Sequence, residues 1–201
     1  PGSSVYLNEQ FTRSAFLDGV KSGKHPVVHV ATHFSFRAGH DDASFLLLGD
    51  RSALSVKEIS DRVTSGLFEG VELLTLSACE TAVSSEQNGR EFEGFAALAQ
   101  RAGVRSVVAT LWAVADVTTA ELMRRYYELR GKEPRMSKAE ALRRAQLALL
   151  RGELEVRGEG RRGAVPAGGG QSTAPRFTPP ADAPYAHPYY WAPFVMMGNW
   201  R

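Results

Sequence analysis

Two residues with the chemistry of a nucleophile and a base follow two apolar segments of the sequence. His33 ends the segment 26–33, and Cys79 comes shortly after the segment 71–76. A thiol attacks a carbonyl group as its thiolate, and a neighbouring imidazole can stabilise that thiolate and then donate a proton to the leaving amine. Such a pair needs adjacent strand ends, and ligands of open α/β sheets gather at the carboxyl ends of the strands.

Cys79 is the only cysteine of the chain, and this limits the chemistry open to it. A single cysteine forms neither an internal disulfide nor a Cys-rich zinc site, and it is typical of a reducing compartment, so we expect a cytoplasmic protein. The sequence has Ser85 where a phosphate-binding C-x₅-R loop needs arginine, and it contains no G-x-S-x-G, P-loop or H-E-x-x-H motif. The residues alone leave two interpretations of Cys79, a reactive thiol or a small buried filler.

Three histidines recur at every fourth residue, His25, His29 and His33, and this spacing raises the question of a metal site. The valines and Pro26 among them favour a strand, on which positions 29 and 33 lie about 13 Å apart at roughly 3.3 Å per residue. That separation is too large for one shared ion. We therefore expect no metal and no cofactor, and we interpret His29 as structural.

The composition is that of a globular chain with no electrostatic preference for one class of partner. Its 201 residues are 43% hydrophobic and 23% charged, and 24 basic against 22 acidic residues give a formal net charge of +2. Dedicated nucleic-acid and membrane-surface domains usually carry a strong basic excess, so we expect no direct nucleic-acid contact and no membrane partner. Because the first residue is not Met, we expect a domain excised from a larger protein.

Short apolar segments alternate with segments of helical periodicity, which indicates an α/β fold. We expect strands at 26–33, 71–76, 104–111 and 194–197, and a hairpin formed by 45–48 and 53–54. Capping boxes of the S/T-x-x-E type predict helices that begin at Ser55, Thr118 and Ser137. Two further helices are expected at about 8–21 and at 91–102, the second with Gly103 at its carboxyl end.

The segment after the last of these capped helices differs from the rest of the chain. Residues 152–188 hold seven of the 19 glycines and six of the 10 prolines, with few large apolar residues. Such a composition cannot bury enough apolar surface to fold alone. We therefore expect a single domain over residues 1–201 with a flexible insertion at about 152–186.

Five blocks of the sequence, in order, resemble those of CHAT domains, which are caspase-like domains often found behind TPR repeats in bacteria. The first two are Val30-Ala31-Thr32-His33 and the segment Leu76 to Ala82, which includes Cys79. The other three are Glu93-Gly94-Phe95 with Ala102-Gly103-Val104, the segment Val107 to Asp116, and the segment His187 to Phe194. The resemblance covers roughly residues 25–150 and 187–200.

This resemblance implies a caspase-like three-layer sandwich, with a mainly parallel central sheet flanked by helices on both faces. It also implies that Cys79 is the nucleophile and His33 the general base and acid. By the same resemblance, the backbone N–H groups of Cys79 and Phe34 hold the oxyanion. Most members of the family have glycine where this chain has Phe34, a departure that bears on the size of the substrate more than on catalysis.

The loop after the third central strand is expected to line the substrate groove, again by resemblance. Asp116 either selects a basic residue before the scissile bond or caps the following helix, and the two roles are compatible. Trp112 is either an aromatic wall of the groove or a core residue. Glu80 adds a charge beside the nucleophile and is a third candidate for substrate binding.

The expected function is that of a cysteine endopeptidase that makes limited, specific cuts in a protein or peptide substrate. The family context implies control by TPR repeats or by a regulatory protein, in bacterial signalling or defence. Two other functions stay open. One is a non-catalytic interaction or signalling module on the same fold, and the other is a different cysteine enzyme, an amidase or acyltransferase.

Overall fold

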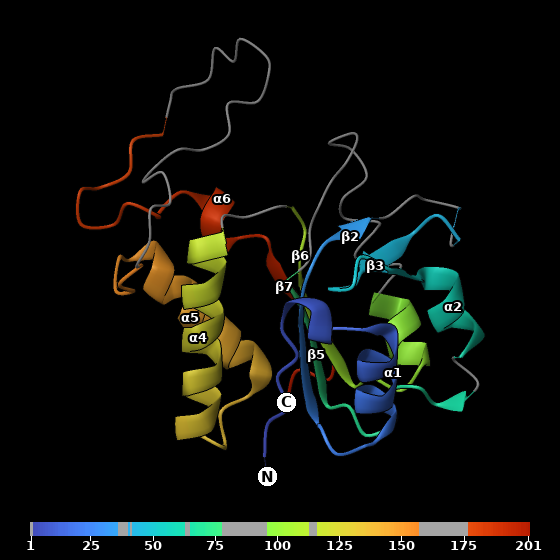
Figure 1. Cartoon of the computed structure of the whole chain (residues 1–201). Helices are drawn as coiled ribbons and strands as arrows, with labels where there is room; N and C mark the ends of the chain where they lie inside the picture. The colour runs from blue at the N-terminus through green and yellow to red at the C-terminus, as the bar shows by residue number, and fades with distance from the viewer. Residues whose placement is uncertain are drawn as a thin grey trace. The chain divides into compact units, whose positions relative to one another are not determined.

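The structure is a computed structural model that describes residues 2–35, 40, 42–62, 65–77, 96–112, 116–156 and 177–201. The chain forms two compact units. The first comprises residues 1–113 and 195–199, and the second comprises residues 114–194 and 200–201. Each unit is described separately below, and Figure 1 shows the elements of both.

The first unit is built on a four-stranded sheet with the strand order β1-β5-β6-β7. Its strands are β1 (Val27–Ala31), β5 (Leu73–Ser77), β6 (Ser106–Thr110) and β7 (Phe194–Gly198). The pairs β1–β5 and β5–β6 are parallel. All four strands lie where the sequence predicts them, and the predicted α/β fold with a mainly parallel central sheet is confirmed.

The apolar core of this unit lies on one face of the sheet. Val30 on β1 and Leu74 and Leu76 on β5 point to this face, as does Val107 on β6, because side chains alternate along a strand. They pack with Phe16 and Val20 of α1 (Arg13–Lys21) and with Ala96 and Ala99 of the helical residues 96–101. Each such buried aliphatic side chain contributes about 1.5–3 kcal/mol, so this face holds the sheet in place.

A smaller antiparallel sheet follows β1 in the chain. Its strands are β2 (Phe34–Ser35), β3 (Phe45–Leu47) and β4 (Ala53–Ser55), in that order. The predicted hairpin is β3–β4, and Arg51 in its turn has a φ of 67°. Gly49 lies against the backbone of the 3₁₀ turn at Asn8–Gln10, whose Asn8 carbonyl oxygen would be only 1.6 Å from an added Cβ atom.

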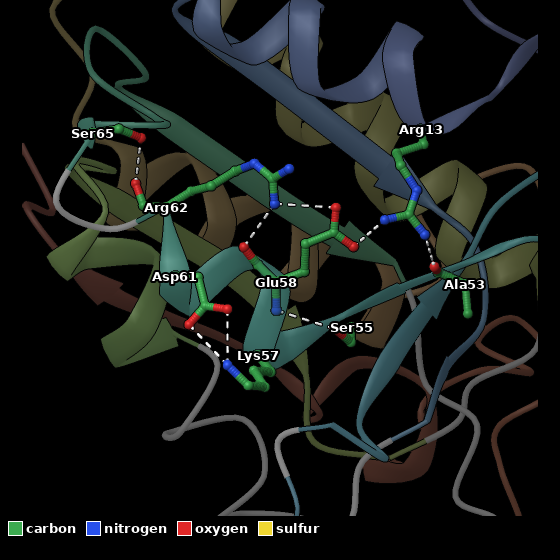
Figure 2. Close-up of polar contacts among 8 residues, drawn as sticks. All are labelled: Arg13, Ala53, Ser55, Lys57, Glu58, Asp61, Arg62 and Ser65. Atoms are coloured by element: carbon green, nitrogen blue, oxygen red, sulfur yellow. Dashed lines mark hydrogen bonds and ion pairs between the residues drawn. The ribbon is translucent and has the colours of Figure 1, made fainter.

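A group of charged side chains ties α1 to the helix that follows β4, α2 (Val56–Asp61). In Figure 2 the Glu58 carboxylate lies between the guanidinium groups of Arg13 and Arg62 and pairs with both. Arg13 also donates a hydrogen bond of 2.6 Å to the Ala53 carbonyl oxygen. The Ser55 hydroxyl accepts from the Glu58 N–H, so the helix start predicted at Ser55 is confirmed.

The second unit is helical in its described part, with α4 (Asp116–Lys132), α5 (Lys138–Leu150) and α6 (Pro188–Trp191). Figure 1 shows α4 and α5 side by side. Ser137 caps α5 by accepting from the Glu140 N–H, as predicted. Gln146 on α5 donates to the carbonyl oxygens of Trp191 and Phe194 and so joins α5 to α6 and the residues after it.

Two predicted helix starts are wrong. The capping box predicted at Thr118 is not used, since α4 begins two residues earlier at Asp116 and Thr118 is fully buried within its first turn. The N-terminal helix begins at Arg13 and not near residue 8, because the hydroxyl of Thr12 accepts from the Ala15 N–H and caps the helix there.

Most of the Gly/Pro-rich segment, residues 157–176, lies outside the described residues. Beyond it the chain packs closely: Ala183, Tyr185 and Ala186 are buried. Gly152, at a φ of 71°, lies so close to the Asp182 carbonyl oxygen that an added Cβ atom would be 2.0 Å from it. The two ends of this segment are therefore in contact within the second unit.

The glycine that ends the helical residues 96–101 supplies the first testable prediction. Gly103 has a φ of 113°, and an added Cβ atom would lie 3.1 Å from the backbone carbon of Phe68. We expect Gly103→Ala to lower the free energy of unfolding by about 2 kcal/mol, from backbone strain and this close approach. Urea denaturation measures the change.

Gly131→Ala is the matched control, because Gly131 lies in α4 with no atom within 4 Å of an added Cβ. Alanine favours a helix interior over glycine, so this variant should be neutral or stabilised by up to about 1 kcal/mol. Equal effects of the two substitutions would contradict the account of Gly103.

Candidate active site

The carboxyl ends of β1 and β5 meet at one edge of the sheet. Their parallel register pairs Val27 with Leu73 and, four residues on, Ala31 with Ser77. The two strands end at these last paired residues, so the chain leaves both strands at the same level. The segments that follow contain His33 and Cys79.

His33 lies two residues beyond the end of β1, and its backbone is hydrogen-bonded to β3. The Leu47 N–H of β3 donates a hydrogen bond of 2.9 Å to the His33 carbonyl oxygen. The Thr32 hydroxyl donates to the Leu47 carbonyl oxygen. One residue of β3 thus fixes two successive residues after β1, while the His33 side chain is exposed to solvent.

Phe34 begins β2 and pairs with Leu46 of β3. Hydrogen-bonded and non-hydrogen-bonded pairs alternate along an antiparallel ladder. Because the neighbouring pair, His33 and Leu47, carries a ladder hydrogen bond, the Phe34–Leu46 pair is of the other kind. The Phe34 N–H therefore points away from β3. Its ring is half-buried and packs against the apolar core, so the core takes up part of its bulk.

A second histidine contacts β5 just below the strand ends. The His29 Nε2 atom lies 3.0 Å from the Ser77 Oγ atom, within hydrogen-bond distance. Both residues lie on the sheet face opposite the apolar core, by strand alternation. The His29 residue keeps solvent-exposed surface, but neighbouring protein atoms partly desolvate its ring, and this desolvation lowers the pKa of the imidazole.

The remaining expected site residues divide between the described and the undescribed parts of the chain. Trp112 follows β6 by two residues and is half-buried, at the same carboxyl edge of the sheet as His33. Asp116 is the first residue of α4 in the second unit, and its side chain lies outside what the structure describes. Cys79 and Glu80 also lie outside the described residues.

No metal centre is formed within the ranges that the structure describes, where no group of three or more His, Cys, Asp or Glu side chains could hold an ion. None of the helices in these ranges has the length and hydropathy of a membrane span.

Three residues that matter to this edge were not singled out in the sequence. Leu47 and Thr32 place the His33 backbone, and Ser77 is the partner of His29. Of the three, only Ser77 has a sequence signal, since it and Thr75 are the two polar residues of the otherwise apolar strand β5. Residues two apart along a strand share a face, so Thr75 and Ser77 lie on the face opposite the apolar core.

The comparison with protein families agrees with the blocks quoted from the sequence. A family model described as the CHAT domain matches residues 1–199. No curated protein matches the chain.

The contribution of the Thr32 hydroxyl to stability can be tested by substitution. Thr32→Val keeps the shape of the side chain but removes the donor to the Leu47 carbonyl oxygen, so we expect the free energy of unfolding to fall by about 1 kcal/mol. Thr32→Ser keeps the hydroxyl and should lose less. Denaturant titration of both variants checks this order, and a Thr32→Val protein as stable as the parent would refute the role of the hydroxyl.

Proposed function

The chain belongs to the CHAT domain family, a group of caspase-like domains related to cysteine peptidases, and on this premise we propose that it is a cysteine endopeptidase that makes limited cuts in a protein substrate. The nucleophile of the proposal is Cys79 and the general base and acid is His33. The observation that carries it is the register of the two strands that precede these residues.

Each residue of β1 pairs with the residue of β5 that comes 46 positions later in the sequence. Ala31, for example, pairs with Ser77 (77 − 31 = 46). The same offset separates His33 from Cys79, as 79 − 33 = 46. If the register continued for one more pair on the same face, the imidazole and the thiol would be direct neighbours. The backbones of paired residues on adjacent strands lie about 5 Å apart, which is close enough for two side chains on the same face to come within hydrogen-bond reach.

The proposed reaction is nucleophilic catalysis in two steps. The Cys79 thiolate attacks the peptide carbonyl carbon, a C–S bond forms, and the oxyanion of the tetrahedral intermediate accepts hydrogen bonds from backbone N–H groups. His33 then protonates the amine as the C–N bond breaks. Water hydrolyses the thioester and returns the thiol.

The Phe34 N–H is the proposed oxyanion donor supplied by β2, together with the Cys79 N–H. Its direction supports this role, because the ladder between β2 and β3 turns the Phe34 N–H away from β3. The substitution of phenylalanine for glycine leaves the backbone donor in place and narrows the range of substrates by bulk.

We also propose the substrate contacts that the family resemblance implies. Trp112 would form a wall of the groove, and Asp116 would favour a substrate with a basic residue before the scissile bond. Glu80, next to the nucleophile, would be a third substrate contact. The partners would be TPR repeats or a regulatory protein that gates the site, in a bacterial cytoplasm. In the same proposal the chain is one domain with an insertion at about 152–186, which is flexible between its two packed ends.

The lone cysteine makes the proposal simple to test, since every alkylation event reports on Cys79. At pH 6.5 an ordinary thiol, with a pKa near 8.5, is only about 1% thiolate. An activated Cys79 should react with iodoacetamide at least about tenfold faster than N-acetylcysteine, measured by intact mass. His33→Ala should remove this advantage.

His25→Ala is the matched control, because it removes a histidine at the opposite end of β1. It should leave the labelling rate unchanged. A parent protein that reacts no faster than the free thiol, with no effect of His33→Ala, would leave the non-catalytic module as the function. Labelling by small amides or thioesters, but by no peptidyl electrophile, would replace the endopeptidase with an amidase or acyltransferase.

A further inference from the structure

His29 and Ser77 form a polar contact that the proposed reaction does not use. The His29 Nε2 atom and the Ser77 Oγ atom are 3.0 Å apart, and the two residues come from different strands, β1 and β5. The contact is therefore a link between the two strands in addition to their backbone hydrogen bonds.

This contact lies at the carboxyl ends of the two strands. Ser77 is the last residue of β5 and pairs with Ala31, the last residue of β1. Cys79 follows Ser77 by two residues, and His33 follows His29 by four. Fixing Ser77 against β1 therefore fixes the points from which the segments with Cys79 and His33 leave the sheet.

The surroundings of His29 suit an uncharged imidazole. Neither β1 nor β5 contains an Asp, Glu, Lys or Arg residue, and burial is the cause that lowers the pKa of His29. The nearest charged group before β5, Glu72, is paired with Arg105. The other titratable groups that flank these two strands are Lys24, His25 and His33 beside β1, and Cys79 and Glu80 after β5. A neutral ring has one nitrogen that accepts, and a hydroxyl is a suitable donor to it.

We propose that Ser77 and His29 are a positioning pair for the Cys–His dyad, in which the Ser77 hydroxyl donates to the Nε2 atom of neutral His29 and holds the carboxyl ends of β5 and β1 together. This inference rests on the proposed function, since it assigns the pair to the same site. Neither residue touches the reacting atoms in this scheme; they act through the separation of Cys79 and His33.

Loss of the pair should weaken the dyad without unfolding the sheet. Ser77→Ala removes a single oxygen atom from a half-buried residue, so the backbone register can persist. The strand ends then move more freely, the Cys79–His33 ion pair forms less often, and the thiol pKa rises. We expect the iodoacetamide rate at pH 6.5 to fall about fivefold, and the pH midpoint of labelling to rise.

The matched control is Val28→Ala, on β1 beside His29 but on the opposite face of the sheet, where Val28 packs against the apolar core. It should lower thermal stability while leaving the pH midpoint of Cys79 labelling unchanged. Ser77→Thr, which keeps the hydroxyl, should restore most of the labelling rate. The labelling rate of the double variant, His29→Phe with Ser77→Ala, should fall no further than that of either single variant. Each single substitution already breaks the same contact, so the second adds nothing.

An NMR titration of the His29 ring protons supplies a readout that does not depend on reactivity. A donor to the neutral ring favours the neutral form, so Ser77→Ala should raise the pKa of His29. Fast labelling of the parent together with unchanged labelling in Ser77→Ala, or an unchanged His29 pKa, overturns the positioning pair alone. A parent protein without an activated thiol overturns the proposed function, and the positioning role with it.

Discussion

The parallel pairing of β1 with β5 is the constraint on which the arrangement of this edge depends. It joins Ala31 to Ser77 with an offset of 46 residues, and a slip of one residue would turn every side chain of a strand to the other face. Val30, Leu74 and Leu76 would then leave the apolar core, which opposes such a slip. The core on one face thus fixes which residues share the polar face at the strand ends.

Contacts on the sheet face opposite the core, and contacts with the small antiparallel sheet, fix the chain where it leaves β1. His29 and Ser77 are in contact on the face away from the core, and Leu47 of β3 contacts the backbone of His33 and the hydroxyl of Thr32. The chain that leaves β1 is therefore constrained on two sides. The His33 side chain is thus held at its backbone while it stays exposed, which suits the base of the proposed dyad.

Much of this fold could be predicted from the sequence, because the signals are local. The strands are runs of β-branched and leucine residues, and Ser55 and Ser137 cap their helices as their spacing to Glu58 and Glu140 predicts. Two contacts could not be predicted: the one between His29 and Ser77, and the hydrogen bond from the Leu47 N–H to the His33 carbonyl oxygen. Each depends on a register between segments that are far apart in the sequence. The start of α4 differs from the prediction, since the helix already includes Thr118, which is buried in its first turn.

A cross-link tests most directly whether the register brings position 33 beside Cys79. Paired residues in this register would have Cα atoms about 5 Å apart, within the range that a disulfide spans. We predict that His33→Cys forms an intramolecular disulfide with Cys79 on mild oxidation, so that neither thiol is alkylated in the monomer. Thr32→Cys is the control, since the Thr32 hydroxyl is directed at β3, and it should keep two free thiols. Two alkylatable thiols in oxidised His33→Cys would contradict the account.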